Sequence, residues 1–125
     1  MSALADEARR LAEQARSAMP AMAAAGQSAK NSALLKAAEL LYHQRRAILA
    51  ANNIDTKVAK RSGLAPAMID RLSLNARRLE QMAESLRQVA SLPDPVGQII
   101  DGWTQPNGMR LRRMRTPLGV VLIIY

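Results

Sequence analysis

Few side chains in this sequence are of the types that perform enzyme chemistry. His43 is the only histidine, and cysteine is absent, so the segment has no thiol nucleophile and no cysteine-ligated metal. His43 stands beside Gln44, Arg45 and Arg46 without a paired carboxylate, which favours a solvated or packing role. Neither a G-x-G-x-x-G motif nor a phosphate-loop lysine motif occurs. We therefore expect no catalytic residue and no metal site within these 125 residues.

The aspartates near basic or turn residues have ordinary structural explanations. Asp70 precedes Arg71 in a short predicted helix, where it is expected to form a surface pair or a cap. Asp94 and Asp101 lie near the two ends of a predicted strand. Aspartate at such a position usually forms hydrogen bonds within a turn.

The chain is strongly basic, with a formal net charge of +8 from 18 basic and 10 acidic residues. A basic excess permits binding to phosphate groups or to an anionic surface. However, one Trp, two Tyr and no Phe give little support for base stacking. Arg112 and Arg113 are adjacent on a predicted strand and so point to opposite faces, which argues against one concentrated phosphate clamp. We therefore expect these arginines to lie on a strand that is solvated or that takes part in complex formation, and not to bind nucleic acid.

Two long helices are predicted in the first half of the chain. Ser2 can cap the first, which Pro20 and Gly26 interrupt or end. The second is predicted over residues 28–51, where apolar residues recur at helical spacing, and Asn52-Asn53 breaks the pattern. Both helices are rich in Ala, which favours helix but buries little apolar area. They therefore need a larger body to pack against.

Shorter helices are predicted to follow. Asp55 can cap one that ends at Gly63, a residue suited to the left-handed position after a helix. Pro66 fits the first turn of another, and Asn75 can cap a longer one. Residues 1–92 are thus predicted to be a helical part of the protein.

The character of the sequence changes at Pro93-Asp94-Pro95, which removes two backbone donors and marks a boundary. Residues 96–101 and 109–115 are predicted to be strands joined around Pro106-Asn107-Gly108, a hairpin signal. Leu111 and Met114 fall on opposite faces of the second strand. We expect this hairpin to be covered by another part of the protein or by another subunit.

The last nine residues, 117–125, form an apolar and β-branched run without polar alternation. Such a run is typical of a parallel strand that helices cover on both faces. Because nothing in the sequence supplies those helices, we expect the chain to be the front part of a larger α/β protein. The longest apolar run is too short to span a bilayer, and the N-terminus lacks the basic and apolar regions of a signal peptide. A cytoplasmic protein is the expectation.

Four stretches of the sequence resemble the γ-glutamyl phosphate reductases, also called glutamate-5-semialdehyde dehydrogenases, a branch of the aldehyde dehydrogenase superfamily. They are AKNSALLKAAELL from Ala29, ILAANNIDTKVAKRSGL from Ile48, MIDRLSLNARRLEQMAESLRQVASLPDPVGQIIDG from Met68 and LRRMRTPLGVVLIIY from Leu111. They occur in the order and at the spacing of the family, and the similarity is weakest before Ala29.

The resemblance implies an aldehyde dehydrogenase-like α/β protein of which this chain is an N-terminal fragment. Residues 1–92 would be the helical part of the cofactor-binding domain, 93–116 a hairpin of the oligomerisation sheet, and 117–125 the first strand of a Rossmann-like domain that binds NADP. Ile124 and Tyr125 match positions at the end of that strand and are the implied cofactor-binding residues. The resemblance also implies a homo-oligomer formed through residues 96–115, and a glutamate 5-kinase as a partner.

The reaction implied is the NADPH-dependent reduction of L-glutamyl 5-phosphate to glutamate 5-semialdehyde, a step of proline biosynthesis. In this family a cysteine thiolate displaces phosphate to form a thioester, which hydride then reduces to the aldehyde. This chain has no cysteine and is predicted to be inactive alone. Two alternatives stay open: another aldehyde dehydrogenase with a different substrate, and a basic helical module that binds nucleic acid or protein.

Overall fold

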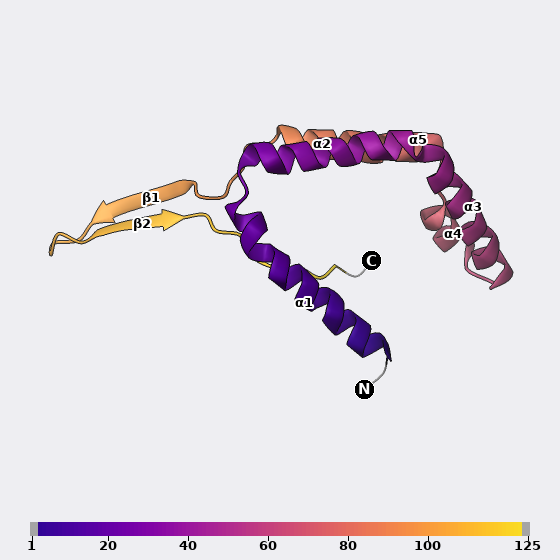
Figure 1. Ribbon diagram of the computed structural model, residues 1–125, viewed down its shortest axis with the longest axis horizontal. Helices are drawn as coiled ribbons and strands as arrows, with labels where there is room; N and C mark the ends of the chain where they lie inside the picture. Colours follow the sequence, from indigo (N-terminus) through magenta and orange to yellow (C-terminus); the bar gives the residue numbers. More distant parts are fainter. Residues whose placement is uncertain (1–2, 124–125) are drawn as a thin grey trace. The chain divides into compact units, whose positions relative to one another are not determined.

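The computed structural model describes residues 3–123, which divide into two compact units. One unit comprises residues 28–92 and is entirely helical, whereas the other combines the segments before and after it and contains a helix and a β-hairpin (Figure 1). The prediction of a mainly helical segment followed by a hairpin is confirmed. One unit ends at Leu92, next to the predicted boundary, but residues 1–27 belong to the other unit together with the hairpin.

Helix α1 (Ala3–Ala24) continues through Pro20, so the prediction that this proline interrupts or ends the helix is wrong. A proline in a helix interior costs about 3 kcal/mol relative to Ala. Here the Ala-rich stretch that follows favours helix, and the Ala25 amide donates to the Ala21 carbonyl at 3.0 Å. The helix ends just before Gly26, and the predicted cap Ser2 lies outside the described residues.

Helices α2 (Gln27–His43) and α3 (Arg45–Arg61) replace the single helix predicted over residues 28–51. They meet at Gln44, which has φ −93° and ψ 7°. The Arg45 guanidinium donates to the Tyr42 carbonyl at 3.1 Å and lies over the Tyr42 ring, 4.4 Å from its centre. A cation that satisfies a terminal carbonyl stabilises a helix end, so this contact supports a break that contains neither Gly nor Pro.

Helix α3 runs through Asn52-Asn53, so the break and the Asp55 cap predicted there are wrong. The reason is that the Asn52 side chain is 9% exposed and forms tertiary hydrogen bonds, described below. The end of α3 agrees with the prediction. Gly63 has φ +73°, its amide donates to the Lys60 carbonyl, and the Leu64 amide donates to that of Ala59, which is a Schellman motif.

Helices α4 (Pro66–Leu72) and α5 (Ala76–Ser91) begin as predicted. Pro66 occupies the first turn of α4, and the Asn75 side chain caps α5 by accepting a 2.8 Å hydrogen bond from the Arg78 amide. The buried apolar residues of the described part are few and mostly small: Ala38, Leu79, Ala83 and Ala90. This sparse core agrees with the expectation that the helices bury little apolar area.

The hairpin consists of β1 (Ile99–Thr104) and β2 (Arg110–Met114), paired antiparallel (Figure 1). Its turn forms where predicted, with the Gly108 amide donating to the Gln105 carbonyl at 2.9 Å. The first strand starts later than predicted. Asp94 accepts from the Val96 amide and Gly97 has φ +82°, so residues 96–98 form a turn before the strand begins.

Residues 117–123 form neither helix nor strand, although the sequence predicts a strand there. Their apolar side chains are exposed, from 48% for Val120 to 97% for Leu118. A strand needs a hydrogen-bonded neighbour. None of the described residues pairs with this run, since the sheet consists of β1 and β2.

Candidate functional site

The described residues assemble no catalytic centre. Among residues 3–123, no group of three or more His, Asp or Glu side chains could hold a metal ion. His43 is the exposed last residue of α2, and its ring meets the Tyr42 ring edge-on, with 5.7 Å between ring centres. Over the same range, none of the helices has the length and apolar character needed to cross a membrane.

The predicted cofactor-binding residues, Ile124 and Tyr125, lie outside the described residues. The run that leads to them is described, and it presents its apolar side chains to solvent, with Leu122 84% exposed. Gly119 has φ +103°, and a Cβ built there would lie 3.5 Å from the Met19 sulfur of α1. The run therefore contacts α1 while leaving a largely uncovered apolar surface.

The hairpin also exposes apolar side chains. Trp103 pairs with Leu111 across the two strands, and Trp103 is 46% exposed. Asp101 pairs with Arg113 and their side chains form a 3.2 Å salt bridge, so Asp101 has a strand role rather than the turn role expected. Asp94 does have the expected turn role, because its carboxylate accepts from the Val96 amide at 3.0 Å.

Two polar side chains hold the turn between α4 and α5, and sequence reasoning missed both. Asn52 of α3 donates to the Leu72 carbonyl at 2.8 Å and accepts from the Leu74 amide at 2.7 Å. Arg78 of α5 donates to the Ser73 carbonyl at 2.6 Å and to both carboxylate oxygens of Asp70 at 3.1 Å. Asp70 is thus paired with Arg78 and not with its neighbour Arg71.

We call these contacts the 70–75 clasp, meaning the hydrogen bonds from Asn52 and Arg78 to residues 70–75. They join three helices of one unit, α3, α4 and α5, and α3 also contacts α4 and α5 directly. The clasp fixes the backbone between α4 and α5. It brings together no reactive group, so its role is structural.

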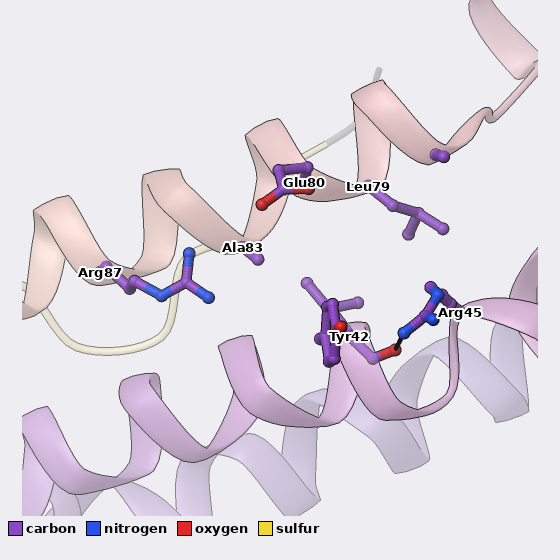
Figure 2. A pocket seen from close by; sticks show the side chains of 8 residues that line it. Tyr42, Arg45, Leu79, Glu80, Ala83 and Arg87 are labelled. Carbon is purple, nitrogen blue, oxygen red and sulfur yellow. Dashed lines mark hydrogen bonds between the residues drawn. The ribbon is translucent and has the colours of Figure 1, made fainter.

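A shallow hollow of about 200 Å³ lies between α2 and α5 in the helical unit. Figure 2 shows Tyr42 and Arg45 on one side of it and Glu80 and Arg87 on the other. Arg45 is engaged with Tyr42, and Arg87 forms a 3.1 Å salt bridge with Glu84. These cations already have partners, so the hollow carries no clear ligand specificity.

Two exposed pairs on helix surfaces have shifted pKa values. The Arg10 guanidinium lowers the pKa of Glu7, and Glu7 in turn raises the pKa of Arg10. A hydrogen bond from Lys36 lowers the pKa of Glu39. Each pair consists of residues three apart on one helix, and none of these shifts marks a catalytic acid or base.

The fold thus defines a scaffold segment of mixed helix and hairpin rather than a complete active site. Comparison with known proteins then shows which enzymes contain such a segment. The chain is 46% identical over 113 residues to the γ-glutamyl phosphate reductase of Syntrophomonas wolfei, and 49% identical over 115 residues to that of Opitutus terrae. These matches cover 90% and 92% of this chain, and 27% of each relative.

Solved structures agree. The crystal structure of γ-glutamyl phosphate reductase from Thermotoga maritima matches with a TM-score of 0.79 and 39% identity, over 85% of this chain and 26% of that one. The enzyme from Saccharomyces cerevisiae matches with a TM-score of 0.81 and 30% identity, over 94% of this chain and 29% of that one. No family model matches the chain.

The resemblance drawn from the sequence is therefore confirmed: the chain is similar to the N-terminal region of γ-glutamyl phosphate reductases. It spans about a quarter of the length of the relatives that it matches.

Proposed function

We propose that this chain is the N-terminal part of an NADPH-dependent γ-glutamyl phosphate reductase. The observation that carries the proposal is the agreement of two comparisons, with sequence identities of 46% and 49% over at least 90% of the chain and a TM-score of 0.79 to a solved reductase. The full-length enzyme would reduce L-glutamyl 5-phosphate to glutamate 5-semialdehyde in proline biosynthesis, and would act in the cytoplasm. Its cysteine nucleophile would lie outside these 125 residues.

In this proposal, each part of the chain has a structural role in the enzyme. Residues 1–92 pack against a Rossmann-like domain whose first strand is 117–125, and residues 93–116 belong to an oligomerisation sheet. The exposed apolar side chains of 118–123 support the strand assignment, because a buried parallel strand is apolar on both faces. The exposed Trp103 and Met114 support a hairpin that another subunit covers.

The chain's proposed contribution to the NADP site is restricted to the end of this strand, at Ile124 and Tyr125. Residues 117–123, which lie before them, offer backbone groups and apolar side chains. These suit a strand that lies beside a dinucleotide, but residues 117–123 carry no cationic side chain for its phosphates. NADPH would provide the hydride of the reaction. We assign no chemical step to a residue of this chain, and the substrate L-glutamyl 5-phosphate would bind elsewhere in the enzyme.

Two partners are part of the proposal. The enzyme would form a homo-oligomer through the hairpin at residues 96–115, whose strands each have one unpaired edge. A glutamate 5-kinase would be a functional partner, because an acyl phosphate hydrolyses easily in water and must be made by a phosphoryl-transfer enzyme close at hand.

The test is an assay of the full-length polypeptide in the reverse direction, with glutamate 5-semialdehyde, inorganic phosphate and NADP. The expected result is NADPH formation that requires phosphate, because phosphate must cleave the thioester to give the acyl phosphate. A simple aldehyde such as propanal is the matched control substrate. Equal oxidation of propanal without phosphate would indicate another aldehyde dehydrogenase, and inactivity on both would overturn the proposal.

A further inference from the structure

The tip of the hairpin carries a dipeptide that is chemically labile. Asn107 precedes Gly108 in the exposed turn that joins β1 to β2 (Figure 1). The sequence contains four other asparagines, and each precedes a residue with a side chain. Those four lie in α2, in α3 or at the cap of α5.

The geometry of the turn favours attack of the Gly108 backbone nitrogen on the Asn107 side chain. The Asn107 Oδ1 accepts a 3.1 Å hydrogen bond from the Met109 amide, which turns the side-chain carbonyl toward the following backbone and polarises it. Gly108 has no side chain to hinder the attack, and a Cβ built on it would meet nothing within 4 Å, so the turn is open on that side.

One hydrogen bond opposes the reaction, because the Gly108 amide donates to the Gln105 carbonyl at 2.9 Å. This bond must open before the nitrogen can lose its proton. It belongs to an exposed turn and not to the ladder between the strands, so its local opening costs little free energy. The amides that follow Asn31, Asn52 and Asn53 lie within helices, where opening disrupts a longer cooperative element. Asn75 is followed by Ala76, whose methyl group hinders the approach of its nitrogen to the side-chain carbonyl.

We propose that Asn107 is the site at which this protein undergoes spontaneous deamidation in the folded state. Hydroxide removes the Gly108 amide proton, and the nitrogen forms a bond to Cγ of Asn107. Water gives a proton to the side-chain nitrogen, the bond from Cγ to that nitrogen breaks and ammonia leaves, which regenerates hydroxide and gives a five-membered succinimide. Water then opens the ring at either carbonyl to give aspartate or isoaspartate, with no oxidation or reduction.

The modification changes both charge and backbone at the turn. Each product adds one negative charge to a chain whose formal net charge is +8. Isoaspartate also places one extra methylene in the main chain between Gln105 and Met109, whose backbone groups close the turn through a 2.8 Å hydrogen bond from the Gln105 amide. The product therefore alters the end of a hairpin whose register is set by this turn.

The test is peptide mapping by mass spectrometry of the purified full-length polypeptide, incubated in mildly alkaline and in mildly acidic buffer. The expected result is that Asn107 converts before any other asparagine, faster in the alkaline buffer, with part of the product as isoaspartate. An Asn107→Ser variant keeps an oxygen that can accept from the Met109 amide but has no amide to lose, so it should show no charge change over the same period.

A parallel sample in urea reports the reactivity of the unfolded chain. The proposal is overturned if Asn107 stays intact in the folded protein while it converts in urea. It is also overturned if Asn31, Asn52, Asn53 or Asn75 converts first in the folded protein.

Discussion

Removal of the Asn52 side chain should destabilise the helical unit more than its size suggests. The side chain is 9% exposed and makes hydrogen bonds of 2.8 Å to the Leu72 carbonyl and 2.7 Å from the Leu74 amide. Each such bond contributes about 1 kcal/mol net, and a partly buried partner left unsatisfied costs about 1 to 3 kcal/mol. We therefore expect Asn52→Ala to lower the free energy of unfolding by about 2 to 4 kcal/mol.

The matched control is Asn53→Ala on the same helix. Both substitutions replace Asn by Ala within α3 and so gain the same helix propensity, about 0.5 kcal/mol. Asn53 is exposed, and its side chain lacks the two tertiary hydrogen bonds of Asn52. The difference between the variants thus isolates the contribution of the clasp.

The assay is urea unfolding followed by circular dichroism, together with hydrogen exchange of the Leu74 amide in the purified protein. The account predicts that Asn52→Ala shifts the unfolding midpoint to lower urea and speeds exchange at Leu74. The reasoning is refuted if the two variants unfold at the same urea concentration, or if the Leu74 amide exchanges equally in both.

Further substitutions test other parts of the scaffold. Asn75→Ala should cost about 1 kcal/mol by removing the cap of α5, and Asn75→Ser should recover most of it in thermal unfolding. Gly63→Ala should cost about 1 kcal/mol because φ is +73°, and Gly63→Asn should cost less. Arg78→Met should loosen residues 70–75 in hydrogen exchange, whereas Arg77→Met should not. Residues 1–125 expressed alone should associate, as light scattering would show, because apolar side chains of 118–123 are exposed; a monodisperse monomer would contradict this.

Local signals in the sequence were sufficient for several elements. Pro66, Asn75 and Gly63 each occupy the position predicted, because each has a backbone preference or a capping group that acts within one turn. The hairpin turn at Pro106-Asn107-Gly108 is also local, since Gly108 supplies the positive φ of +85°.

The incorrect predictions have two causes. Some elements depend on contacts between residues far apart in the sequence, and others on a side-chain contact that no residue pattern in the sequence indicates. Asn52 looked like a helix breaker because its partners, 20 and 22 residues away, are not visible in its neighbourhood. The break at Gln44 is accompanied by the contacts of Arg45 with the Tyr42 carbonyl and ring, and no Gly or Pro marks it in the sequence. The i, i+8 pairing of Arg78 with Asp70 likewise requires the turn between two helices to be known.

The strand predicted at residues 117–125 differs from these cases, because residues 117–123 form no strand and no described residue pairs with them. The apolar pattern predicts the strand. The apolar side chains of 118–123 are exposed, as expected for a strand in the absence of the neighbouring strands and helices that would cover it. Its assignment to a Rossmann-like domain, and the cofactor role of Ile124 and Tyr125, stay predictions.

The most direct test of the central claim is hydrogen exchange of the Val121 and Leu122 amides in the full-length polypeptide. If this region is the first strand of a nucleotide-binding sheet, both amides should exchange as slowly as the most protected amides of the protein. Exchange at the rate of an unstructured peptide would contradict the account.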